Sequence, residues 1–157
     1  MPNVVADACT LIVFEKAGLL DLLFQTWGTL LLPLAVYAEV NVAGKAGAAN
    51  ILGRPEVKKE ISVPVVEELA DLGAGEAAAI SLALERSAVL LTDDKKARSR
   101  ARELGLTVRG SLGTLARAKQ LGHIAEVRPC LDALRAAGLY LRQELCDEFL
   151  RSHGERP

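Results

Sequence analysis

Short apolar runs alternate along the chain with longer stretches in which apolar residues recur at helical spacing. The runs are apolar at consecutive positions, which is typical of strands buried on both faces of a parallel sheet. They predict strands at residues 2–7, 28–33, 88–92 and 106–110. A further strand is predicted at residues 61–66, where Pro64 favours a short strand at the edge of the sheet.

Between these runs, the spacing predicts helices that begin and end at familiar signals. A helical stretch at residues 8–25 is interrupted by Gly18, and Ser111 is a candidate cap for a later helix. Further helices are expected at residues 33–40, 75–87, 94–104, 111–122 and 126–151, the last in two pieces separated at Gly138. Residues 41–60 have weak periodicity and predict a mobile helix or loop.

The alternation of strands and helices predicts an α/β fold with three α/β/α layers around a short central parallel sheet. A chain of 157 residues is long enough for one domain with a sizeable core. We expect residues 1–125 to form this domain. Residues 126–157 are expected to form a C-terminal helical extension that packs on it rather than serving as an interface.

The composition excludes several classes of protein. Hydrophobic residues make up 50% and charged residues 25%, which is typical of a globular chain. The net charge of −1 means that any nucleic-acid binding needs a local basic surface. No apolar run is long enough to cross a bilayer, no signal peptide is expected, and three scattered cysteines suit ordinary buried thiols in a reducing compartment. We therefore expect a cytoplasmic protein without a membrane partner.

Acidic residues occur where the apolar pattern predicts something else. Asp7 follows the first strand, Glu39 interrupts an apolar helix, Glu76 opens a buried helix, and Asp93 and Asp94 end the run "LLT". Each has a structural explanation, since Asp7 and Asp93 could cap the following helices, Glu76 could favour a helix dipole, and Glu39 could face solvent. The carboxyl ends of parallel strands meet at one edge of a sheet, so the two strand-end acids are expected to lie close together.

Carboxylates gathered at one edge would repel one another unless a cation neutralised them. Mg²⁺ and Mn²⁺ take oxygen ligands and suit such a group. The two histidines, His123 and His153, lie late in the chain and offer no zinc-like set. A metal site made of carboxylates is therefore the interpretation that this pattern favours.

Four stretches, in this order, resemble a known family: "VVADACTLI", "LPLAVYAEV", "GAGEAAAISLALE" and "LLTDDKKARSRARELGLTVRGSLGTLARAKQLG". Together they are similar to the PIN-domain ribonucleases, in particular to a prokaryotic subgroup related to the VapC-type toxins. The resemblance covers roughly residues 3–122 and is specific in the combination of its motifs, whereas residues 41–60 match nothing in it.

The resemblance implies a PIN-like fold and a metal-dependent endoribonuclease that uses Mg²⁺ or Mn²⁺. It makes Asp7, Glu39, Glu76 and Asp93 the catalytic, metal-binding acids, with Asp94 in place of Asp93 if the register shifts by one residue. Thr92 matches a hydroxyl that orients a carboxylate or a water. The implied partners are RNA, single-stranded or structured, an antitoxin protein if the chain is a toxin, and a second copy in a homodimer.

A basic stretch follows the last acids. Lys95, Lys96, Arg98, Arg100 and Arg102 place five cations within eight residues, which suits a phosphate backbone next to a metal site. Lys95, Lys96 and Arg98 are the candidate substrate-binding residues together with Thr92, and Arg98 also matches the family pattern. The alternative is a solvated helix face with cations near the helix C-terminus.

Aromatic side chains for base stacking are few and far apart in the sequence, so sequence-specific readout by stacking is not evident. The tryptophan and the two tyrosines are Trp27, Tyr37 and Tyr140.

Three other functions fit parts of the pattern. A phosphoacceptor domain would place an acidic pair after the first strand, whereas here the pair follows a late strand. The stretch "GAGEAAA" resembles a dinucleotide-binding turn, but it follows polar residues instead of a strand. The remaining alternative is a PIN-like module that binds nucleic acid or protein without cutting, and the intact acidic set favours the enzyme.

Overall fold

The computed structural model describes residues 3–43, 45–61 and 64–157, and in that part of the chain five parallel strands form one sheet in the order β3-β2-β1-β4-β5. The strands are β1 Val4–Ala6, β2 Leu30–Pro33, β3 Val57–Glu60, β4 Val89–Leu91 and β5 Val108–Arg109. In the register of the sheet, Val5 is paired with Leu31 on one side and with Leu90 on the other. The predicted parallel sheet is confirmed.

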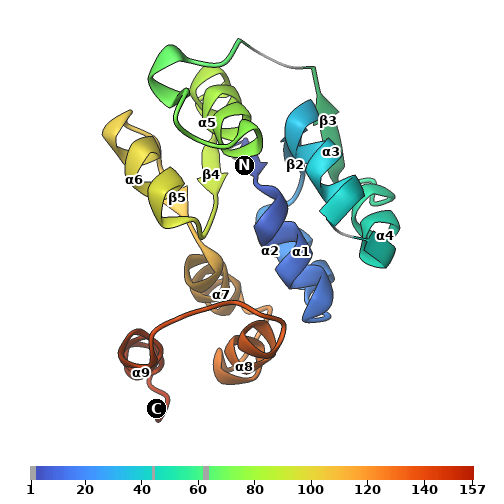
Figure 1. Cartoon of the computed structure of the whole chain (residues 1–157). Coiled ribbons are helices and arrows are strands. Elements are labelled where there is room, and N and C mark those ends of the chain that lie inside the picture. The colour runs from blue at the N-terminus through green and yellow to red at the C-terminus, as the bar shows by residue number, and fades with distance from the viewer. Residues whose placement is uncertain (1–2, 44, 62–63) are drawn as a thin grey trace.

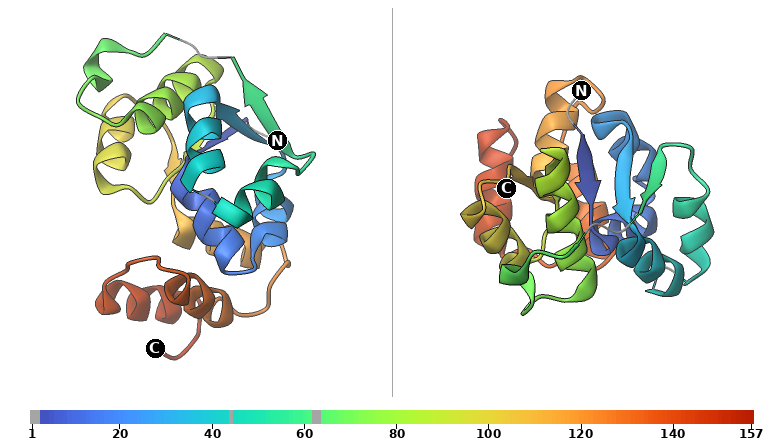
Figure 2. Two further views of the ribbon diagram at one scale, coloured as in Figure 1. Left: turned by 45° about the vertical axis from the view of Figure 1, so that its right-hand side comes forward. Right: turned by 90° about the horizontal axis from the view of Figure 1, so that it is seen from above.

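Helices cover both faces of the sheet, which confirms the three-layer architecture (Figure 2). α3 and α5 contact each other on one face, while α2 and α7 contact each other on the opposite face. The helices are α1 Ala8–Lys16, α2 Leu20–Trp27, α3 Leu34–Ala43, α4 Ala48–Leu52, α5 Ala74–Arg86, α6 Lys95–Glu103, α7 Ser111–Gln120, α8 Arg128–Ala136 and α9 Gln143–Ser152, with 3₁₀ turns at Lys45–Gly47 and Glu67–Leu69. Within the described ranges, none is long and apolar enough to cross a membrane.

α8 and α9 form a layer at one end of the molecule (bottom of Figure 1). Their apolar stripes join the same hydrophobic core as the sheet, through Leu131 and Leu134 of α8 and Leu150 of α9. The N-terminus of α8 has no side-chain cap of its own, and its Val127 and Arg128 N–H groups donate to the Glu155 carboxylate, at 2.8 and 3.0 Å. The last residues of the chain therefore cap the first helix of the extension.

The predicted strand at residues 61–66 is wrong, and the helix or loop predicted at residues 41–60 holds for α4 but not for residues 57–60. The edge strand is Val57–Glu60, inside the stretch predicted as a helix or loop, and the described residues of 61–66 are not in a strand. Residues 44, 62 and 63 lie outside the described part of the chain. Strand β3 has only partly buried and exposed positions, so it lacks the apolar run by which the other strands were found.

The prediction that Ser111 caps a helix is also wrong. Gly110 occupies the N-cap position of α7, and Ser111 is the first residue of the helix. The helix still has a capping acceptor, which comes from a distant part of the sequence and is described below.

The strand order reverses between β1 and β4, because the chain moves from β1 to β2 and β3 and then crosses to β4 and β5. Such a reversal opens a crevice beyond the carboxyl ends of the two central strands, where ligands bind in open α/β sheets. Backbone bonds continue past both ends, from Asp7 N to Leu91 O at 3.1 Å and from Thr92 N to Arg109 O at 3.0 Å. The backbone at Asp7 and Thr92 is therefore fixed at this edge.

Candidate active site

Asp7 is the most buried acid at this edge, with 6% of its surface exposed. It caps α1, since Oδ1 accepts the Thr10 N–H at 2.8 Å, and Oδ2 accepts the Thr92 hydroxyl. Burial raises the pKa of Asp7 to about 6, although the hydrogen bonds from Thr92 and Thr10 lower it, and the charge of Asp93 adds to the rise. The fold thus holds a carboxylate here in a position where its negative charge is costly.

The doubled aspartate divides into two structural roles. Asp94 caps α6 by accepting the Ala97 N–H at 2.7 Å. Asp93 turns away from α6 and accepts both the N–H and the hydroxyl of Ser111, so it supplies the capping acceptor of α7. The structural explanation of Asp93 as a cap for the helix that follows it is therefore wrong, because Asp94 has that role. Asp93 and Ser111 join the ends of β4 and β5, which the parallel register places side by side.

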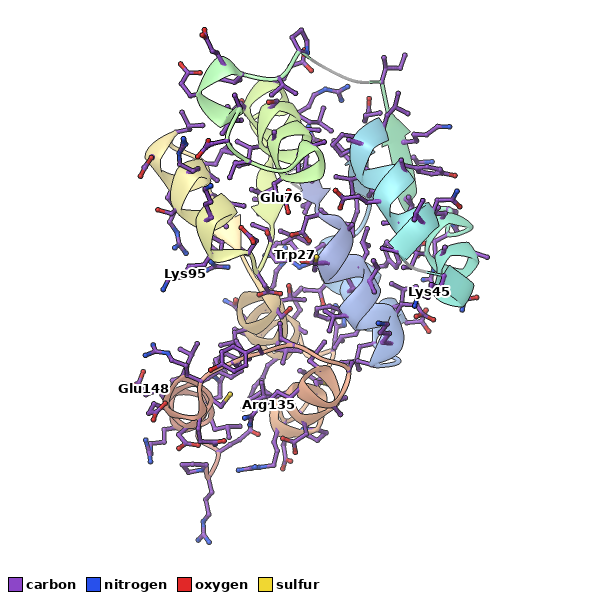
Figure 3. All side chains as sticks on the ribbon, viewed as in Figure 1. Trp27, Lys45, Glu76, Lys95, Arg135 and Glu148 are labelled. Atoms are coloured by element: carbon purple, nitrogen blue, oxygen red, sulfur yellow. The ribbon has the colours of Figure 1, made fainter. Side chains whose placement is uncertain are left out.

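Glu39 and Glu76 lie on α3 and α5, with their carboxylates against glycine backbone. A Cβ atom at Gly75 would overlap Glu39 Oε1, and one at Gly73 would overlap Glu76 Oε2. Burial and the charge of Glu76 raise the pKa of Glu39, while a hydrogen bond from the Gly75 backbone lowers it. Glu76 stands in the first turn of α5 (Figure 3), and the two glutamates are electrostatically coupled.

Asp93 shares this feature, because a Cβ atom at Gly110 would lie 2.5 Å from both Asp93 Oδ1 and Arg98 Nη1. Three of the predicted acids thus rest on glycines, where any other residue would displace the carboxylate or move the backbone. The sequence shows these glycines, but only the fold shows which carboxylate each of them accommodates.

Cys9 connects the two pairs of acids. Partial burial raises the pKa of its thiol, and the charges of Asp7, Glu39, Glu76 and Asp94 raise it further. The charges of four of the five predicted acids therefore act on this one thiol, although these acids come from four separate parts of the chain. Cys9 is exposed, which differs from the prediction of ordinary buried thiols, whereas Cys130 and Cys146 are buried.

The chemistry of these donors fits a hard divalent cation. The five acids offer only carboxylate oxygens, which Mg²⁺ and Mn²⁺ prefer. Beside Asp7, the buried Thr10 Oγ1 has no hydrogen-bond partner of standard geometry among the described residues. In the same part of the chain, no three His, Cys, Asp or Glu side chains form a group that could hold a metal ion as they stand. The fit thus rests on the type of donor and on the repulsion between the charges of the acids.

Sequence and structure comparisons place the chain among known proteins. The model of the family DUF3368, described as a PIN domain, matches residues 3–155. The chain belongs to the PIN-domain family. A solved PIN-type structure, a PilT N-terminus domain protein (SSO1118) from the hyperthermophilic archaeon Sulfolobus solfataricus P2, is similar with a TM-score of 0.57 and 19% sequence identity. The similarity covers 73% of this chain and 92% of that one, and it confirms the fold. No curated protein matches significantly.

In this PIN domain, the basic helix α6 divides between the site and another surface. Arg98 donates to the Thr92 carbonyl at 2.9 Å and lines a cavity with Asp93 and Lys95. Lys96 instead pairs with Asp71 at 3.4 Å, and Arg100 pairs with the same carboxylate at 2.9 Å. Burial and the charge of Arg102 lower the pKa of Arg98, while Asp93 raises it.

Of the predicted substrate-binding residues, Lys95 and Arg98 therefore lie at the acids and Lys96 lies toward the 67–72 segment. Lys95 stands at the start of α6 (Figure 3). Thr92 is 1% exposed and orients the Asp7 carboxylate, with its oxygen also accepting the Asp94 N–H at 3.1 Å.

Four residues at the PIN-domain site were not found from the sequence. Ser111 and Thr10 carry hydroxyl groups next to predicted acids, and Cys9 precedes Thr10 in α1. Tyr140, from the connection between α8 and α9, lines two cavities that both include Asp93. The neighbours of Asp7 could have been found from their position in the sequence, since a helix capped by Asp7 must place residues 9 and 10 beside it. Nothing local indicates Tyr140 or Ser111.

Proposed function

We propose that the protein is a metal-dependent endoribonuclease. The observation that supports this most directly is the meeting of acids at the β1–β4 edge. The charge of Asp93 raises the pKa of Asp7, and the charge of Glu76 raises the pKa of Glu39. Members of both pairs also raise the pKa of the Cys9 thiol. Acids whose pKa values are raised by burial and by one another are typical of functional sites. PIN domains are typically nucleases.

The four acids Asp7, Glu39, Glu76 and Asp93 would hold one or two Mg²⁺ or Mn²⁺ ions, and Asp94 would contribute only after giving up its cap. A bound ion supplies Lewis acidity, which activates water and neutralises charge on a phosphodiester. The chain itself does the positioning. The Thr92 hydroxyl fixes the orientation of the Asp7 carboxylate.

On the substrate side, Lys95 and Arg98 are placed to bind the phosphates of RNA. Both line the cavity of about 230 Å³ that includes Asp93. Among the described residues, Lys95 takes part in no recorded ion pair, so its ammonium group is available to a phosphate. Arg98 is fixed by its bond to the Thr92 carbonyl, which directs the guanidinium toward the acids.

One observation favours a second candidate, a PIN-like module that binds nucleic acid or protein without cutting. Both carboxylate oxygens of Asp93 accept hydrogen bonds from Ser111. A side chain used in this way has a purely structural role unless a cation competes for it. Binding of RNA without any cleavage would support this candidate.

The deciding experiment measures cleavage of assorted RNAs and of DNA with Mn²⁺, with Mg²⁺ and with a chelator. Wild type is compared with Asp7→Asn and Asp93→Asn. Asp132→Asn is the matched control, because it changes an exposed aspartate of α8 in the same way. The proposal expects metal-dependent cleavage by wild type and the control, and none by the two site variants. Equal activity of all four proteins would show that the acids do not act in cleavage.

A toxin role within this proposal has its own test. It expects a short gene immediately upstream whose product binds the protein, blocks cleavage and restores growth of cells that express it. Co-purification of that product, and the size of the nuclease alone and in the complex, would test the antitoxin partner and the homodimer together.

A further inference from the structure

Tyr140 is an exposed aromatic residue on a firmly anchored segment. The residue is 85% exposed, while Leu139 and Leu141 on either side pack against the hydrophobic core. The backbone turns after α8 at Gly138, with φ +112°, and the Leu139 N–H donates to Leu134 O at 3.0 Å. The two partly buried leucines anchor the backbone on either side of Tyr140. The tyrosine itself stays largely uncovered.

The position of Tyr140 links it to the acids. It lines one cavity of about 230 Å³ with Asp93, Lys95 and Arg98, and another of about 250 Å³ with Asp93, Cys9 and Lys16. Asp93 is thus common to both. Each of the two cavities that Tyr140 lines also contains a cationic side chain.

We infer that Tyr140 is a substrate-binding residue that stacks on a nucleobase of single-stranded RNA next to the cleaved bond. The inference rests on the proposed function. Aromatic side chains are the usual platforms for unpaired bases, and their stacking is tolerant of sequence. Lys95, Arg98 and Lys16 would meet the phosphates on either side. The C-terminal extension then completes the site in addition to stabilising the domain.

Stacking of this kind does not conflict with the sequence prediction that sequence-specific readout is not evident. One ring contacts the face of any base and leaves its hydrogen-bonding edges unread. The inferred site therefore distinguishes unpaired RNA from duplex, because bases inside a duplex are already stacked.

The test measures binding of a labelled single-stranded oligoribonucleotide and of the same oligomer with abasic residues at its centre, in chelator so that neither is cleaved. Tyr140→Ala should bind the intact oligomer about 5- to 100-fold more weakly than wild type and the abasic oligomer equally well. Tyr140→Phe keeps the ring and should bind like wild type. Ile61→Ala is the matched control, since Ile61 is 84% exposed and lines neither cavity.

The inference is overturned if Tyr140→Ala binds the intact oligomer like wild type, or if it loses affinity for both oligomers equally. Loss of a dimer in Tyr140→Ala, with base-dependent binding unchanged, would instead assign the ring to a protein interface. Cleavage by wild type with Mn²⁺, measured in parallel, separates this outcome from failure of the proposed function. If the protein cleaves no RNA but its binding of bases depends on Tyr140, the stacking site is supported and the proposed nuclease function is refuted.

Discussion

Replacement of Asp7 by asparagine should stabilise the metal-free protein at neutral pH. The carboxylate is buried, and its pKa is raised to about 6 because burial disfavours the charged form more than the hydrogen bonds favour it. Asparagine has nearly the same shape and keeps an oxygen for the Thr10 N–H. The variant therefore removes the charge while it leaves the cap of α1 in place.

The size of the effect follows from the two pKa values. In the unfolded chain the carboxyl group has its ordinary pKa of 3.8, so between pH 3.8 and about 6 the folded state holds a proton that the unfolded state has lost. Stability from this group is fully present below pH 3.8 and is lost as the pH rises through about 6. The whole change amounts to about 3 kcal/mol, of which about 2 kcal/mol falls between pH 4.5 and 7.5.

The assay is urea unfolding of wild type and Asp7→Asn in chelator, at four pH values from about 4.5 to 7.5. The difference in free energy of unfolding between the two proteins cancels the titration of all other groups. It should shift by about 2 kcal/mol in favour of the variant as the pH rises. Asp132→Asn, measured in the same way, is the control for the loss of an exposed carboxylate.

A difference between wild type and Asp7→Asn that stays constant over this range would refute the reasoning, because it would mean that the folded protein does not bind the proton more tightly. Added Mg²⁺ extends the test. A cation that binds only the folded state stabilises it by about 2.7 kcal/mol at a concentration of 100 Kd. Wild type should gain stability at pH 7.5, and Asp7→Asn should gain much less.

Two further predictions concern single features of the site. Gly75→Ala should push the Glu39 carboxylate out of its place, because the new Cβ would overlap Oε1, while alanine itself is more favourable than glycine in a helix. Cleavage assays should show lost activity and thermal unfolding no lost stability, and full activity would contradict the assigned position of Glu39. Lys95→Ala should weaken RNA binding and reduce the slope of log K against log[salt] by about 0.7. Lys96→Ala should leave this slope unchanged, because the Lys96 ammonium group pairs with Asp71 in the wild-type protein, and equal slopes for both variants would contradict the division of α6.

The fold could be predicted from the sequence wherever burial is complete. β1, β2 and β4 are apolar at every position because helices cover both faces, and this continuous apolar run is the signal by which they were found. β3 lies at the edge of the sheet, and its sequence "VKKE" reads as polar loop. It is a strand because its four residues pair with β2, although its side-chain pattern does not predict one.

The acids could be predicted because each of them breaks an apolar pattern, but their partners could not. Asp93 and Ser111 are 18 positions apart and meet only because β4 and β5 are parallel neighbours. Tyr140 shares two cavities with Asp93 because the packing of α8 and α9 brings their connection to this edge. A sequence pattern predicts the secondary structure and burial of a residue, whereas contacts of this kind depend on which strands and helices pack side by side.

The run "LLTDD" illustrates how a structural role and a chemical role can share one segment. Asp94 starts α6, which fixes the chain direction after β4, and Thr92 bonds both to the Asp94 N–H and to the Asp7 carboxylate. The cap of one helix is thereby tied to the acid that caps another. Asp93, free of the α6 cap, is held by Ser111 through hydrogen bonds that a cation could replace. A metal-dependent hydrolase would need this combination at the edge of the sheet. The backbone around Thr92 and Asp94 stays fixed, while the Asp93 carboxylate can exchange its hydrogen bonds for a cation.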